Sequence, residues 1–176
     1  KLVSLYRDTF LNLSTDTYNK ANLAYSKGGP KQAIAMLNMN LDLNITDFVT
    51  IGFEGVINAI DSIGGIEINV TEAEIVHLNN FQISMVGKQD GLNAAGEPNF
   101  VATPGVDYEP VTQPGLQKLN GLQATAYMRI RYVGNDFGRT QRQRTVIEKV
   151  VKKVHDSKEY GLGETITFEI KITNIY

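Results

Sequence analysis

The pattern of hydrophobic and polar residues over positions 119–154 predicts a strand, a turn and a helix. Residues alternate from Ala126 to Val133 as in a β-strand, which places Arg129 and Arg131 side by side on one face. From about Gly138 the spacing changes to three and four residues, which is typical of an amphipathic helix. The stripe of this helix consists of Arg139, Arg142 or Gln143, Val146 or Ile147, Val150 and Val154.

Strand patterns and helix patterns also follow each other through the rest of the chain. Residues 1–13 predict a strand, a break at Arg-Asp-Thr (7–9) and a short extended continuation. Further strands are predicted at 48–53 and 66–70, and helices at 20–26, 30–41, 56–63 and 72–86. Gly28 and Gly29 separate the first two helices, and Thr71 with Glu74 forms a capping box for the last one. We therefore expect an α/β fold, a layered domain with a central mixed β-sheet flanked by helices.

Two regions depart from this alternation. Residues 87–115 are rich in glycine and proline and predict a long irregular excursion, which is either a lid or substrate-contacting segment or an insertion without such a role. Residues 165–174 alternate again as a strand. We expect one catalytic domain over residues 1–155, and the membership of the C-terminal strand segment, 156–176, is open.

The composition of the chain argues against several classes of binding and catalytic site. The net charge is −2, although five of the six arginines fall between Arg129 and Arg144, so the basic cluster is local and no nucleic-acid partner is expected. Cysteine is absent, and neither His77 nor His155 has the spacing of a metal ligand. Phosphate-loop, dinucleotide-binding and nucleophile-elbow motifs are absent too. No run reaches transmembrane length, so any anchor is expected upstream of Lys1.

The arginine cluster predicts an anion site. Arginines in the first turn of a helix oppose the macrodipole, and a bound anion would compensate them while meeting free backbone N–H groups and bidentate donors. The alternative is a solvated basic helix that pairs with surface carboxylates. Arg7 and Asp8 follow a predicted strand, and open α/β sheets bind ligands at strand ends. The alternative for this pair is an ion pair that fixes a turn.

Four segments form an ordered set of motifs. SLYRDT at 4–9 is similar to a strand ending in Ser-x-Pro-Arg-Asp-Thr, with Tyr6 in place of proline, and NKANLAYSKGGP at 19–30 is similar to Lys-x-Asn-x-Ala-Tyr-x-x-Gly-Gly. FVTIGFEGVINAIDSIGGIEINV at 48–70 is similar to a strand–helix–Gly-Gly–strand unit. The fourth segment is GLQKLNGLQATAYMRIRY at 115–132, followed by DFGR at 136–139 and RQ at 142–143. Together they resemble the LytR-CpsA-Psr family of bacterial cell-wall glycopolymer ligases.

This resemblance implies a phosphotransferase on the outer face of the bacterial membrane, on the cell-wall side. Members move a phosphoglycopolymer of teichoic acid or capsule type from undecaprenyl pyrophosphate to peptidoglycan, and an N-terminal anchor usually holds them at the membrane. By motif match, the catalytic residues would be Arg7, Asp8, Arg129 and Arg131. Asp136, Arg139, Arg142 and Gln143 would either bind the pyrophosphate as well or contact the residues that bind it.

The resemblance also implies a Mg²⁺ cofactor, whose aspartate ligands lie in family strands upstream of the matching segment. We therefore assign no metal ligand in this chain. Two other functions stay open: a non-catalytic module that binds a polyprenyl pyrophosphate or an anionic glycan, and a lipid pyrophosphatase.

Overall fold

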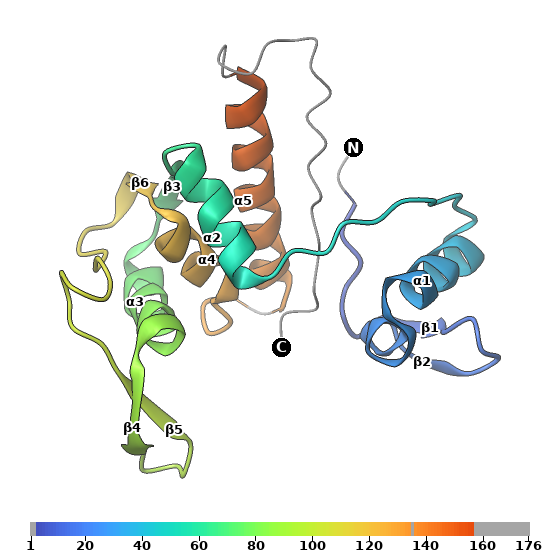
Figure 1. Cartoon of the computed structure of the whole chain (residues 1–176), viewed down its shortest axis with the longest axis horizontal. Helices are drawn as coiled ribbons and strands as arrows, with labels where there is room; N and C mark the ends of the chain where they lie inside the picture. Colours follow the sequence, from blue (N-terminus) through green and yellow to red (C-terminus); the bar gives the residue numbers. More distant parts are fainter. Residues whose placement is uncertain (1–2, 135, 157–176) are drawn as a thin grey trace. The chain divides into compact units, whose positions relative to one another are not determined.

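The computed structural model describes residues 3–134 and 136–156, which divide into two compact units (Figure 1). One unit reaches to Gly55 and the other starts at Val56. The α/β class is confirmed, and the described strands form three two-stranded antiparallel sheets. In chain order the elements are β1 (Phe10–Asn12), β2 (Tyr18–Lys20), α1 (Asn22–Leu41), α2 (Phe53–Ser62), β3 (Ile66–Val70), α3 (Glu72–Val86), β4 (Lys88–Leu92), β5 (Pro98–Val101), β6 (Gly115–Leu119), α4 (Gly121–Arg129) and α5 (Asp136–Asp156).

The first unit is the β1–β2 hairpin with α1 packed beside it. Its small core consists of Leu13, Ala21, Ala24 and Met36. The Asn40 side chain joins helix and hairpin, because its amide nitrogen donates to Asn12 O (2.7 Å) and its oxygen accepts from Asn12 N (3.2 Å). Gly28 and Gly29 break the helical conformation inside α1, and Gly29 has φ +64°, which favours glycine. The predicted helix break is therefore confirmed.

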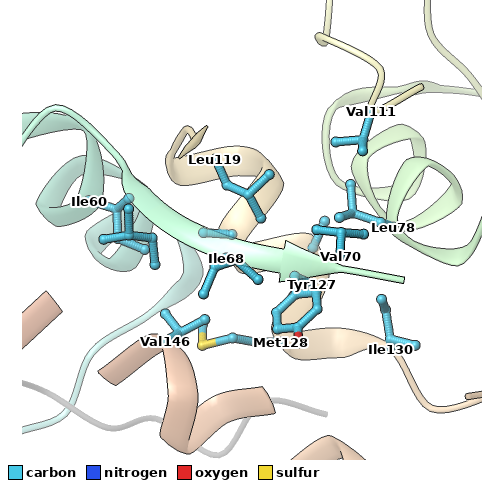
Figure 2. Close-up of a cluster of buried hydrophobic side chains, with 13 residues drawn as sticks. Ile60, Ile68, Val70, Leu78, Val111, Leu119, Tyr127, Met128, Ile130 and Val146 are labelled. Carbon is cyan, nitrogen blue, oxygen red and sulfur yellow. The ribbon is translucent and has the colours of Figure 1, made fainter. Parts of the chain in front are cut away.

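The second unit is built on the β3–β6 ladder, and its buried hydrophobic side chains gather around β3 (Figure 2). Along β3 the buried positions alternate with exposed ones, so Ile66, Ile68 and Val70 point into the core while Glu67 and Asn69 face solvent. Side chains from the surrounding elements complete this core: Ile60, Leu78, Val111, Leu119, Ala124, Ala126, Tyr127, Met128, Ile130 and Val146. The predicted strand 66–70 and the predicted helix 72–86 are both confirmed.

The predicted strand over Ala126–Val133 is wrong, because Gly121–Arg129 forms helix α4. The Asn120 side chain caps this helix by accepting from Gln123 N (2.8 Å), and the Gln123 side chain accepts from Asn120 N (2.9 Å). Residues 123–128 are all buried. Because this helix has no solvent-exposed face here, its sequence lacks the repeating polar positions by which an amphipathic helix is recognised. Arg129 therefore ends a helix, and Arg131 lies in the irregular segment after it.

Two other predicted strands do not form. Among the residues that the structure describes, 3–6 form no strand, and the segment 48–53 has only the isolated bridge positions Thr50 and Ile51 before α2 begins at Phe53. The excursion at 87–115 is not irregular throughout, because β4 and β5 pair as an exposed hairpin. Near the end of the excursion, Val111 is buried, and its backbone forms hydrogen bonds of 2.8 and 2.9 Å with the side chain of Asn79. The predicted strand at 165–174 lies outside the described residues. None of the helices described is long and apolar enough to span a membrane.

Candidate anion-binding site

Arg142 lies in the interior of the second unit, where three acceptors bind its guanidinium. Its Nε donates to Oε1 of Glu74 at 2.7 Å, Nη1 donates to Ile130 O at 3.3 Å, and Nη2 donates to Val133 O at 2.5 Å. The side chains of Arg142 and Glu74 are only 8% and 7% exposed. Arg142 therefore ties α5 to α3 and to the backbone of residues 130–133.

The local sequence makes room for this contact. Gly138, in the DFGR motif, lies so close that a Cβ on it would be 3.2 Å from Val133 O and 3.4 Å from Nη1 of Arg142. The Tyr127 ring also contacts Arg142, with its centroid 5.9 Å from the central carbon of the guanidinium. The predicted stripe of α5 is thus confirmed at Arg142 and at Val146, which is also buried.

Glu74 is held as a carboxylate by its hydrogen bonds. Burial alone would raise its pKa, but donors from Thr71 and Arg142 outweigh that effect and hold the pKa below its ordinary value of 4.5. Thr71 donates both its backbone N–H (2.9 Å) and its hydroxyl (2.8 Å) to Oε2 of Glu74. One carboxylate therefore caps α3 and neutralises Arg142.

A lowered pKa in the folded state predicts lower stability in acid. Protonation of Glu74 is disfavoured in the folded chain, so its contribution is present above the unfolded pKa, near 4.5, and is lost as the pH falls through the lower folded pKa. Urea unfolding of the wild type and of Glu74→Gln measures this contribution. The difference between the two should be large at neutral pH and shrink below about pH 4. A difference that does not change with pH would contradict the assignment.

Arg129 and Arg131 are placed differently from Arg142. The guanidinium of Arg129 is half-buried, 5.1 Å from the centroid of the Phe81 ring, whereas Arg131 is exposed. Burial and the neighbouring charge of Arg131 both lower the pKa of Arg129. Arg131 has no salt bridge with the residues that the structure describes. An anion beside these two cations would relieve their mutual repulsion.

Helix α5 brings further predicted residues to the same unit. Arg139 and Gln143 are partly buried and lie one turn apart. Asp136 begins the helix.

Arg7 and Asp8 are bound by two residues of the second motif, Lys20 and Asn22. Nζ of Lys20 lies 3.3 Å from Oδ1 of Asp8 in an exposed ion pair. The buried Asn22 amide, in the orientation that satisfies both of its groups, accepts from Nε of Arg7 and donates to the Arg7 carbonyl oxygen, each at 3.2 Å. The motifs at 4–9 and 19–30 therefore meet in the first unit.

Several residues of the site were not singled out from the sequence. Lys20 and Asn22 could have been added, since the motif at 19–30 aligns both. Glu74 was predicted as a helix cap, but its contact with Arg142 spans 68 positions and leaves no local signal. For a metal, the described residues contain no group of three histidine or acidic side chains arranged to hold an ion.

The fold and these side chains define an α/β protein in which exposed Arg131 lies beside half-buried Arg129. The chain matches the LytR_cpsA_psr family over residues 1–169. Biofilm regulatory protein A of Streptococcus mutans is 35% identical over 87% of this chain and 34% of its own length. A polyisoprenyl-teichoic acid–peptidoglycan teichoic acid transferase, TagU of Enterococcus faecalis, is 33% identical over 87% of this chain and 41% of its own length.

A solved structure of the family protein TagT with bound octaprenyl pyrophosphate superposes with a TM-score of 0.63, at 21% identity, over 86% of this chain and 51% of that one. At that identity the likeness shows the shared fold. The chain spans less than half the length of the two curated relatives. This chain belongs to the LytR_cpsA_psr family, which confirms the resemblance found in its motifs.

Proposed function

We propose that the chain is part of an enzyme that transfers a phosphoglycopolymer from a polyprenyl pyrophosphate carrier to peptidoglycan, on the extracytoplasmic side of the membrane. The observation that carries the proposal is the pair of adjacent cations, Arg129 and Arg131, of which the second is exposed. The relative TagU is named as a transferase with a polyisoprenyl-linked teichoic acid as donor and peptidoglycan as acceptor. A pyrophosphate is the part of such a donor that arginines bind best.

The chemistry asked of the protein is mainly charge neutralisation and positioning. An acceptor hydroxyl forms a bond to the phosphorus that carries the glycopolymer, and the bond from that phosphorus to the bridging oxygen of the pyrophosphate breaks. Polyprenyl phosphate leaves, and the hydroxyl proton passes to a base. Arg129 and Arg131 would stabilise the charge that develops on the phosphate oxygens. In the first unit, Asp8 is paired with Lys20, and by the motif match we expect it to help orient Arg7.

A transfer assay tests the proposal and separates it from its two rivals. The chain is incubated with a polyprenyl-pyrophosphate-linked glycopolymer and peptidoglycan fragments. The expected products are glycopolymer covalently joined to peptidoglycan and free polyprenyl phosphate. Release of the glycopolymer phosphate without an acceptor would instead identify a pyrophosphatase. Binding without any product would identify a binding module.

Magnesium is expected for the family, but the described residues of this chain do not suit it. The ion prefers octahedral oxygen ligation and retains its waters, whereas Asp8 is already paired with Lys20. Titration calorimetry with MgCl₂ should therefore show only weak binding to the chain. Tight binding that Asp8→Asn or Asp136→Asn abolishes would contradict this prediction and make the aspartates metal ligands.

A further inference from the structure

An exposed aromatic side chain, Tyr132, follows the arginine pair directly. Its side chain is 77% exposed. Its ring stacks on His77, with 5.2 Å between the ring centroids and 30° between the planes. This stack, which we term the aromatic platform, covers one face of the tyrosine ring and leaves the phenol accessible to solvent. Burial in the core does not account for a tyrosine held in this way.

Helix α3 contacts both the aromatic platform and the guanidinium of Arg129. His77 lies under Tyr132, and Phe81 lies under the guanidinium of Arg129. These two α3 residues are four positions apart, so they share one face of the helix with a rise of about 6 Å between them. The cation and the aromatic platform are therefore neighbours on one surface, about one helical turn apart.

We infer that the aromatic platform of Tyr132 and His77 binds the first sugar ring attached to the pyrophosphate that Arg129 and Arg131 hold. The apolar C–H face of a pyranose packs on an aromatic ring, and its hydroxyls remain in water. The spacing along α3 suits two groups that are joined by a single glycosidic oxygen, a phosphate and a sugar. This inference rests on the proposed function, because it assumes a pyrophosphate at the arginine pair.

Two probes isolate the sugar contact. One is a polyprenyl pyrophosphate that carries a single N-acetylhexosamine, and the other is the same lipid without sugar. Tyr132→Ala should weaken binding of the sugar-bearing probe by about threefold to tenfold, the range expected for one aromatic contact, and change binding of the sugarless probe less than about twofold. Tyr132→Phe keeps the ring and should bind both probes like the wild type.

Controls keep the outcome interpretable. Val76→Ala changes another exposed residue of α3 and should leave both affinities unchanged. Because Tyr132 is exposed, Tyr132→Ala should melt like the wild type, and Tyr132→Leu supplies a second variant that lacks the ring but keeps apolar bulk. Equal loss for both probes would place the ring against the prenyl chain or the pyrophosphate and overturn the inference. No loss for either probe would overturn it as well, while leaving the proposed function intact.

A wild-type chain that binds neither probe would overturn the proposed function itself, and with it the sugar site. A wild type that binds both probes with equal affinity would overturn the sugar site only. The two failures are therefore distinguishable in one set of titrations.

Discussion

Replacing Arg142 by alanine is expected to lower the free energy of unfolding by roughly 3–5 kcal/mol, because the change leaves one charge of a buried ion pair uncompensated. The carboxylate of Glu74 would lose its ion-pair partner at a site where the Glu74 side chain is only 7% exposed. The carbonyl oxygens of Ile130 and Val133 would each lose a donor. Lysine at position 142 should restore only part of the loss, since a single ammonium cannot match the three directions of the guanidinium donors.

Urea unfolding at neutral pH measures this effect, with Lys152→Ala as the matched control. Lys152 also forms an ion pair, with Asp156, but both side chains are more than half exposed, so its removal should leave stability nearly unchanged. A double-mutant cycle with Glu74→Ala should show that the two losses are not additive, because each single change strands the other charge. If Arg142→Ala is no less stable than Lys152→Ala, the pair does not hold the unit together.

The elements that the sequence predicted well are those whose signals are local. The break at Gly28 and Gly29, the alternation of β3 and the Thr71–Glu74 cap each depend on residues within a few positions of each other. Helix α4 was missed although it carried such a signal, since Asn120 and Gln123 stand at the spacing of a capping box. The alternating apolar residues after them outweighed that signal, because a helix buried on all sides has no polar face to reveal its period.

The sequence alone could not show that the arginines of the cluster have different surroundings in the fold. Arg129, Arg131 and Arg142 are close in the chain and have the same chemistry, yet one is half-buried, one exposed and one interior. The difference comes from α3, which supplies Phe81 to Arg129 and Glu74 to Arg142. Those partners lie 48 and 68 positions upstream, so only the fold assigns each arginine its surroundings.

Removal of either Arg129 or Arg131 is expected to weaken binding of a polyprenyl pyrophosphate by about one to two powers of ten. Each guanidinium would supply charge-assisted hydrogen bonds of roughly 1.5–3 kcal/mol to the pyrophosphate. Lysine should rescue either position only partly, because a point charge does not reproduce the bidentate fork. Titration of the wild type, the two alanine variants and the two lysine variants with one lipid probe measures the effect.

Arg131 gives the cleaner test of the two. Its side chain is exposed, so Arg131→Ala should keep the melting temperature of the wild type and lose affinity alone. Arg129→Ala also loses the contact with the Phe81 ring, and some loss of stability is expected there. Burial is the main cause that lowers the pKa of Arg129, and removing Arg131 takes away only the second cause, the repulsion by its charge. Unchanged affinity with a large drop in melting temperature, at both positions, would mean that these arginines serve the fold and that the pyrophosphate binds elsewhere.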